Sequence, residues 1–189
     1  MNPVEPIRDV GKIVEIKRRL RRRSPRDYLL FTLGINTALR ISDLLSLRVC
    51  DVWEEESGEV KNFLILRERK TGKDQRIKLN AAAREAIEFY LSQAKFSPSD
   101  WLFKSPHVET PLSRVQAWRL LNKWAREVGL TDRIGTHTLR KTWGYHARKQ
   151  GVPLELIQAK LGHSSPAITR RYIGITADEI EDVENQVNL

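Results

Sequence analysis

Residues that start and stop helices recur along almost the whole chain. Ser113 and Gln116 have the spacing of a capping box, in which each side chain bonds the other residue's backbone N–H. Asn80 is a further start signal, and Gly151 and Gly162 are typical of helix ends. Apolar residues between these signals repeat at helical spacing. The chain is therefore expected to be mainly helical.

The expected helices span Asp9–Leu20, 26–36, Ile41–Leu47, a segment from Asn80, a segment from Ser113, 137–150, Pro153–Gly162, a short segment from Ser165-Pro166 with Tyr172 on its last turn, and a segment from Thr176, where Glu179 completes a second capping box. Helical spacing also predicts that Trp118, Trp124 and Trp143 are core residues, and Cys50 is expected to be a small buried one.

Three short stretches have β-like patterns instead. They are residues 49–53, "FLILRER" at 63–69 and "QRIKL" at 75–79. The last two flank "KTGKD", whose Gly72 favours a turn, so they are expected to form a hairpin. The predicted fold class is mainly α with a small antiparallel β-sheet, that is, α+β.

Charge is spread unevenly along the 189 residues, which carry 33 Lys+Arg against 24 Asp+Glu. Residues 173–189 hold five acids and no base, so the preceding residues carry 33 bases against 19 acids, or +14. A basic body favours a polyanionic partner such as nucleic acid over a membrane surface. The densest basic run, Lys17–Arg26, fits either a solvated helix end or a phosphate-contacting patch.

Several classes of protein are excluded or disfavoured. Cys50 is the only cysteine, so neither an intramolecular disulfide nor a cysteine-based metal site is expected. The first residues, "MNPVEPIRDV", lack the pattern of a signal peptide, and no apolar run approaches the roughly 20 residues of a membrane span. These features favour a cytoplasmic protein.

Six polar residues lie in motifs that suggest chemistry. "THTLRK" places His137 and Arg140 three residues apart on one helix face. The others follow from "TALRISDL", "RERKTGKD" and "LGHSSPAITRRY", which contribute Arg40, Lys70, His163 and Tyr172. One short helix separates His163 from Tyr172, so both side chains are expected to reach a common cleft.

Phosphoryl transfer to a tyrosine uses this set of side chains. Two guanidinium groups match the non-bridging oxygens of a phosphodiester and stabilise the charge that develops on them. A tyrosine with an ordinary pKa of about 10 needs nearby cations or a base at neutral pH. A lysine on a hairpin can protonate the leaving oxygen.

The order and spacing of these motifs resemble the tyrosine recombinases, the phage integrase family. The resemblance covers about residues 26–175: "TALRISDL" matches the first arginine box, "HTLR" the second, and "LGHSSPAITRRY" the histidine followed by the nucleophile. Ala38 stands where the family usually has glycine. Each motif is weak alone, but all of them in order are a strong signal.

The resemblance implies a role for each residue. Arg40, Lys70, His137, Arg140 and His163 would surround the scissile phosphate, and Tyr172 would attack it to give a 3′-phosphotyrosyl intermediate and a free 5′-hydroxyl. Neither metal nor any other cofactor would be required. We also expect Lys73 and Lys141 to contact DNA.

The expected organisation is a single catalytic domain over residues 1–189, without the family's N-terminal core-binding domain. Residues 1–24 would form a basic helix and turn, and residues 176–189 an acidic helix that docks on a neighbouring protomer. Double-stranded DNA and further copies of the chain, up to a tetrameric synapse, are the partners that the resemblance implies. The protein would then be cytoplasmic and associated with the nucleoid.

Other interpretations remain open on the sequence alone. The same constellation serves type IB topoisomerases, which reseal the same strand, and a DNA-binding regulator without catalysis would need only the basic surface. For single residues, Tyr172 could be a packing residue, Asp43 could pair with Arg40, Lys73 could replace Lys70, and the histidines could bind metal. The intact set of six favours the recombinase.

Overall fold

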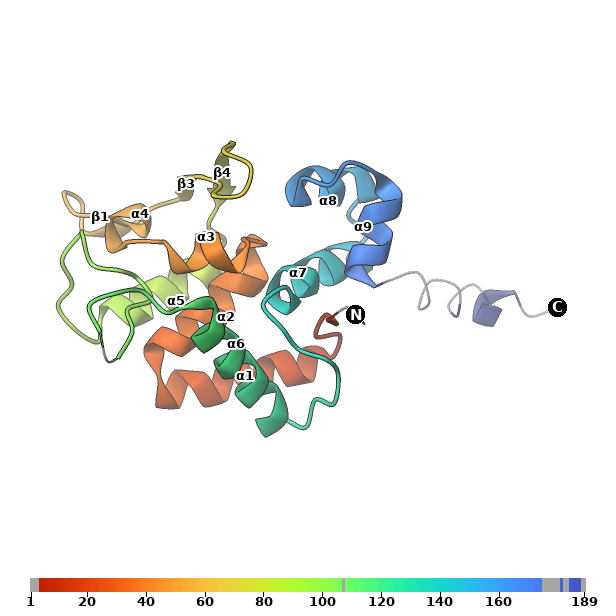
Figure 1. The fold of residues 1–189 in the computed structure, drawn as a ribbon, viewed down its shortest axis with the longest axis horizontal. Helices are drawn as coiled ribbons and strands as arrows, with labels where there is room; N and C mark the ends of the chain where they lie inside the picture. The colour runs from red at the N-terminus through yellow and green to blue at the C-terminus, as the bar shows by residue number, and fades with distance from the viewer. Residues whose placement is uncertain (1–3, 107, 175–180, 182–183, 188–189) are drawn as a thin grey trace.

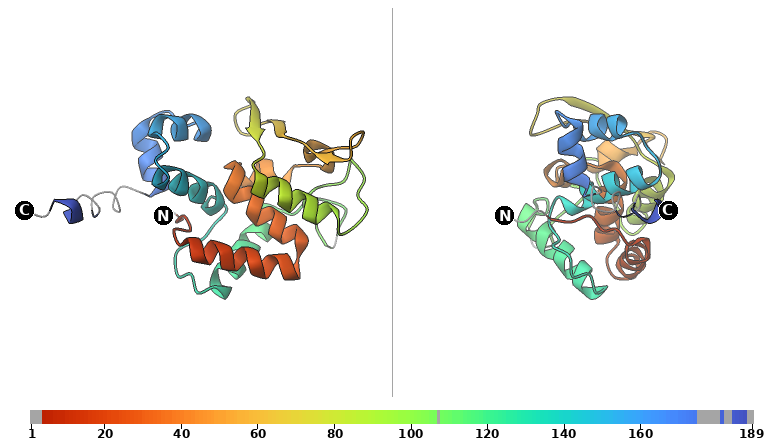
Figure 2. Two further views of the ribbon diagram at one scale, coloured as in Figure 1. Left: turned by 180° about the vertical axis from the view of Figure 1, so that it is seen from behind. Right: turned by 90° about the vertical axis from the view of Figure 1, so that its right-hand side faces the viewer.

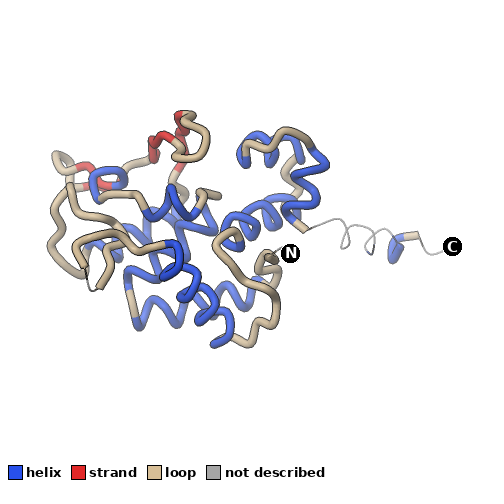
Figure 3. Tube along the Cα trace, in the orientation of Figure 1, coloured by secondary structure: helices blue, strands red, loops and turns tan. Residues whose placement is uncertain are grey.

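The computed structural model describes residues 4–106, 108–174, 181 and 184–187. In these ranges the chain forms helices with two small antiparallel hairpins, which confirms the predicted α+β class (Figures 1 and 3). The helices are α1 (Val10–Arg23), α2 (Pro25–Thr37), α3 (Ile41–Leu45), α4 (Val49–Val52), α5 (Ala81–Leu91), α6 (Arg114–Glu127), α7 (Thr138–Lys149), α8 (Leu154–Leu161) and α9 (Pro166–Ile173). The strands are β1 (Trp53–Glu54), β2 (Glu59–Val60), β3 (Phe63–Arg67) and β4 (Asp74–Lys78).

Local side-chain caps explain where several helices begin. Ser113 accepts from the backbone N–H of Gln116 at 3.1 Å, and Gln116 accepts from that of Ser113 at 2.8 Å, which confirms the first capping box. Asn80 and Ser165 accept from the backbone at the starts of α5 and α9 in the same way. Gly162 ends α8 in the left-handed conformation, as expected of a helix-ending glycine. The second capping box, at Thr176, lies outside the described residues.

The β structure is partly as predicted. β3 and β4 pair antiparallel with Leu64 opposite Ile77, which confirms the hairpin. The prediction of a strand at 49–53 is wrong for its first four residues, because Val49–Val52 form the single turn of α4. Asp51 accepts from the backbone N–H of Arg48 at 2.7 Å, and this local cap outweighs the β preference of the two valines. Only Trp53 enters a strand, in the small β1–β2 hairpin.

Buried apolar side chains form two clusters of unequal size. The larger joins α1 to α6 and the β3–β4 hairpin, and includes Phe31, Leu64 and Trp124. The smaller is built on α7, α8 and α9. Helix α7 touches both, since Leu139 belongs to the larger cluster and Tyr145 to the smaller.

The four predictions about buried side chains have different outcomes. Trp124 is buried as predicted, and Trp143 packs against the smaller cluster. The prediction that Trp118 is a core residue is wrong, because 46% of its surface is exposed. It lies on the flank of α6, beside the buried face of that helix. Cys50 is exposed on α4, so the prediction of a buried thiol is also wrong.

The basic run and the hairpin lie on opposite sides of the molecule. In Figure 1, α1 runs along the lower side, whereas the β3–β4 hairpin and α8 rise on the upper side, and the reverse view in Figure 2 agrees. Several arginines of the run form ion pairs, including Arg21 with Glu85 and Arg23 with Glu127. This placement favours the solvated, ion-paired interpretation over a phosphate-contacting patch.

The segment before α1 lies against α7 and the end of α9. Ile7 donates its backbone N–H to Thr142 of α7 at 2.9 Å, and Arg8 donates to the carbonyl of Gly174 at 3.2 Å. The N-terminal segment is thus bonded both to α7 and to the residue that ends α9. Within the described ranges, no helix combines the length and apolar character needed to cross a bilayer.

Candidate active site

Arg40 is placed by a sharp turn between α2 and α3. Ala38 caps α2 at φ 57° and ψ 22°, and it is the only non-glycine residue in the described ranges with a positive φ. A residue with a Cβ adopts this conformation at a cost of roughly 1 kcal/mol or more, which explains a preference for glycine here. Ala38 nevertheless makes the turn, and Arg40 follows at the start of α3.

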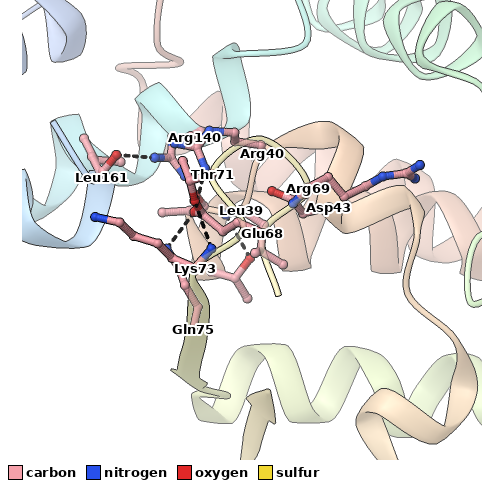
Figure 4. A network of polar contacts seen from close by, with 12 residues as sticks. Leu39, Arg40, Asp43, Glu68, Arg69, Thr71, Lys73, Gln75, Arg140 and Leu161 are labelled. Atoms are coloured by element: carbon pink, nitrogen blue, oxygen red, sulfur yellow. Dashed lines mark hydrogen bonds and ion pairs between the residues drawn. The ribbon is translucent and has the colours of Figure 1, made fainter. Parts of the chain in front are cut away.

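Arg140 is almost fully buried on α7 and is held by the backbone. Its two terminal nitrogens donate to the carbonyls of Ala38 and Leu161, each at 2.5 Å (Figure 4). These bonds tie α7 to the turn before Arg40 and to the end of α8. Burial lowers the pKa of the Arg140 guanidinium from its ordinary value, but an arginine stays charged at any physiological pH.

The β3–β4 hairpin reaches Arg40 through a buried carboxylate. Glu68 forms an ion pair with Arg40 at 2.5 Å, so Glu68, and not Asp43, is its acidic partner. Asp43 instead accepts from the backbone N–H of Arg69 at 3.0 Å. Figure 4 shows the two guanidinium groups of Arg40 and Arg140 side by side above this hairpin.

Both candidate lysines of the hairpin are exposed. Lys70 and Lys73 lie in or next to the turn between β3 and β4. The charge of Lys70 is among those that lower the pKa of His137, so it lies within electrostatic reach of the site. The preference for Lys70 over Lys73 as proton donor stays a prediction.

Tyr172 lies between the two histidines. Its hydroxyl is 3.2 Å from Nδ1 of His137, and its ring centroid is 4.7 Å from that of His163 in an edge-to-face contact. Burial raises the pKa of Tyr172, although the neighbouring Arg140 and Arg40 oppose the shift. The phenol is therefore protonated at neutral pH, and deprotonation must accompany any attack.

The two histidines are neutral at pH 7. Partial burial and then the Arg140 charge lower the pKa of His137, although the residue as a whole is exposed. The same two causes, in the same order, lower the pKa of His163. Nδ1 of His163 lies 3.1 Å from the hydroxyl of Thr169, and this hydrogen bond fixes the orientation of the imidazole ring. A neutral His137 can accept the Tyr172 proton.

Two further lysines surround these groups. Lys141 is buried, and its Nζ lies 5.1 Å from the centroid of the Tyr172 ring, so it lies against that ring rather than on an outer surface. Its predicted contact with DNA stays a prediction. Lys160, on the last turn of α8, is half-buried, and burial followed by the Arg140 charge lowers its pKa to about 8.

Sequence reasoning missed two members of this cluster. Glu68 continues the inward side of β3 after Leu64 and Leu66, and a buried acid at such a position requires a partner; the period-2 pattern was the available signal. Lys160 has no comparable signal. In the part of the chain that the structure describes, no group of three or more His, Cys, Asp or Glu side chains could hold a metal ion.

This fold and this cluster of two arginines, two histidines and a tyrosine define a class of DNA-processing catalytic domain that the comparisons identify. The sequence pattern of the phage integrase family matches residues 8–179. A probable integrase/recombinase, YoeC of Bacillus subtilis, is 44% identical over 178 residues, which are 94% of this chain and 93% of that protein. The chain therefore belongs to the phage integrase family.

Longer relatives contain additional sequence. The tyrosine recombinase XerA of Pyrococcus horikoshii is 32% identical over 96% of this chain, which spans 60% of that protein. Among solved structures, a XerA recombinase matches with a TM-score of 0.77 at 20% identity, over all of this chain and 67% of that one. XerH bound to a palindromic difH substrate matches with a TM-score of 0.73 at 19% identity, over 96% and 52%. The expected tyrosine-recombinase catalytic fold is thus confirmed.

Proposed function

We propose that this chain breaks and rejoins DNA strands as a site-specific tyrosine recombinase, with Tyr172 as the nucleophile. The observation that carries the proposal is the placement of the Tyr172 hydroxyl 3.2 Å from a neutral His137, in a cluster that contains two guanidinium groups and one further histidine. Family membership and the solved XerH–DNA complex support double-stranded DNA as the substrate.

The arginines bind and activate the phosphodiester. Arg140 donates hydrogen bonds to two backbone carbonyls, so the direction of its remaining N–H groups is fixed before DNA binds. Arg40 is fixed by its ion pair with Glu68. Donors that need no reorganisation stabilise the charge of the five-coordinate transition state most effectively. In the tautomer whose Nδ1 accepts from the Thr169 hydroxyl, Nε2 of His163 supplies one more N–H to the same oxygens.

Proton transfers accompany the exchange of one ester for another. As the Tyr172 oxygen bonds to phosphorus, its proton passes to Nδ1 of His137. The bond from phosphorus to the 5′-oxygen breaks, and Lys70 protonates that oxygen. The reverse step, with the 5′-hydroxyl of a partner strand, restores the tyrosine and joins the new strand. The ester conserves the bond energy, so the cycle consumes no ATP.

Recombination requires more than one copy on DNA. We extend the proposal to self-association in a synapse, supported by a solved λ integrase dimer on a core site. The acidic C-terminal segment is proposed to dock on a neighbour, and the single-domain organisation remains a proposal too. Chromosomal DNA as substrate implies a cytoplasmic location, in association with the nucleoid.

A nicked suicide duplex tests the proposal, because loss of a short 5′ fragment traps the covalent intermediate. The parent should form an adduct that survives denaturing gels, whereas Tyr172→Phe should bind DNA equally and form none. Tyr90→Phe, which removes a buried phenolic hydroxyl remote from this cluster, is the matched control and should react normally.

An adduct on the Tyr172→Phe variant would refute the nucleophile assignment, and no adduct on the parent would refute the enzyme. If the parent reacts, a two-site substrate then separates strand exchange from relaxation of a single supercoiled plasmid. Relaxation without exchange would favour the topoisomerase interpretation.

A further inference from the structure

Glu68 places a negative charge inside a cluster that is otherwise built for an anion. Only 5% of its surface is exposed, and it lies against Arg40, one of the two arginines proposed to bind phosphate. A carboxylate there repels a phosphodiester and lowers its affinity for the site. Such a residue requires a compensating role in the architecture.

The contacts of Glu68 connect three separate parts of the site. One carboxylate oxygen pairs with Arg40 and also accepts from the Gln75 side-chain amide at 2.6 Å. The other accepts from the Thr71 hydroxyl at 2.5 Å. Its backbone completes the set, since the Glu68 N–H donates to Lys73 and its carbonyl accepts from Gly72 (Figure 4).

The carboxylate remains ionised in this setting. Burial by itself raises the pKa of Glu68, but the bonds from Arg40 and Thr71 outweigh burial, so the pKa lies below its ordinary value. An ionised acceptor bonds more strongly than a neutral one. The guanidinium of Arg40 has five N–H groups, so an ion pair at one nitrogen leaves others for a phosphate.

We infer that Glu68 is a positioning residue that fastens the Lys70-bearing turn to the Arg40 guanidinium, so that proton donor and phosphate clamp move as one unit. The turn, residues 69–73, is exposed, and the backbone bond from Arg69 to Asp43 is its one other described hydrogen bond to a distant segment. The negative charge of Glu68 weakens binding of DNA but accelerates the step that follows. The inference rests on the proposed function for its kinetic part only.

The first experiment needs no DNA. Trypsin cuts after Arg69, Lys70 and Lys73, so the rate of cleavage within the turn reports how often the turn opens. Glu68→Gln keeps the shape of the side chain but removes the charge, and the turn should be cut about 10- to 100-fold faster, the range for losing bonds to a charged acceptor. Glu56→Gln removes an equal charge from an exposed position and should leave the rate unchanged.

The second experiment separates binding from chemistry on the nicked duplex. For Glu68→Gln, the dissociation constant for DNA should be equal to the parent's or lower, whereas the first-order rate of adduct formation at saturating DNA should fall by about 10²-fold, the effect of a misplacement near 1 Å. A general structural defect would weaken both together. Parental cleavage with parental protease resistance would overturn the inference.

Thr71→Val tests whether the contacts act as one unit. It removes the hydroxyl that Glu68 accepts from while leaving the ion pair with Arg40. If the turn is fastened through the carboxylate, the double variant with Glu68→Gln should cleave DNA hardly more slowly than Glu68→Gln alone. Additive losses would overturn the inference. If the parent forms no adduct, the proposed function fails, yet the protease result still decides whether Glu68 holds the turn.

Discussion

Helix α9, which carries Tyr172, packs against a glycine of α7. Gly144, in the middle of α7, faces Ile173, the residue after Tyr172. A Cβ placed on Gly144 would lie 2.5 Å from Cγ2 of Ile173. Ordinary carbon contacts begin near 3.5 Å, so Gly144→Ala must push α9 away by roughly 1 Å or rotate Ile173.

The expected change in stability is modest, because two effects oppose each other. Alanine in a helix interior is worth about 1 kcal/mol over glycine, whereas overpacking of a buried contact costs about 1–3 kcal/mol. The free energy of unfolding should therefore fall by about 0–2 kcal/mol. Catalysis is more sensitive, since a shift near 1 Å in a reacting group costs about 10²-fold in rate.

Urea unfolding and single-turnover adduct formation on the nicked duplex measure the two quantities. The double variant Gly144→Ala/Ile173→Leu removes the β-branch that the new methyl group meets. Its rate of adduct formation should therefore lie close to that of the single variant Ile173→Leu. Parental adduct formation by Gly144→Ala would refute the reasoning that this contact sets the position of Tyr172.

Four further results are expected. Arg40→Lys and Arg140→Lys should each slow adduct formation by about 10²–10³-fold while DNA binding persists, because lysine lacks the two-pronged donor set; near-parental rates would mean that neither binds the phosphate. The folded-state pKa of His137 is lowered, so as the pH falls the unfolded state takes up this proton before the folded state does. The free energy of unfolding, measured by urea titration, should therefore fall as the pH drops below about 6.5, and His137→Asn should make this dependence on pH weaker. Lys160 has a pKa of about 8 in the folded state and about 10.4 in the unfolded state, so the free energy of unfolding should rise as the pH increases from about 8 to about 10.4. Lys160→Met should raise the free energy of unfolding at pH 7 by up to about 3 kcal/mol and abolish this increase with pH. Adduct formation should proceed in excess EDTA, and an absolute requirement for Mg²⁺ would contradict an arginine-based mechanism.

Much of the fold followed from local signals in the sequence. Helix starts such as Ser113 with Gln116 are decided by a few neighbouring atoms, so the pattern alone locates them. The β3–β4 hairpin followed from two alternating runs around Gly72. The predicted strand at 49–53 was wrong because two β-branched residues suggested a strand, whereas a carboxylate caps a single helical turn there.

The hydrogen bonds and ion pairs within the site did not follow from the sequence, because they depend on contacts between distant segments. Motif spacing placed Arg40, Arg140 and Tyr172 in one site, but the obvious acid for Arg40 was its neighbour Asp43 rather than Glu68, which arrives from another element. The anchoring of Arg140 by two carbonyls is also invisible to side-chain patterns. Trp118 shows a related limit, since periodicity does not reveal how wide the buried stripe is.

The two hydrophobic clusters divide the residues of the candidate site between them. Arg40 and Glu68 are attached to the larger cluster, whereas His163 and Tyr172 are carried by the smaller one, which contains seven buried residues. A small core opens at a lower free energy than the whole domain, so amide hydrogens of α8 and α9 should exchange before those of α2 and α5. Withdrawal of Tyr172 is then a local folding equilibrium, and a substitution in the small core can abolish activity while the melting temperature of the protein hardly changes.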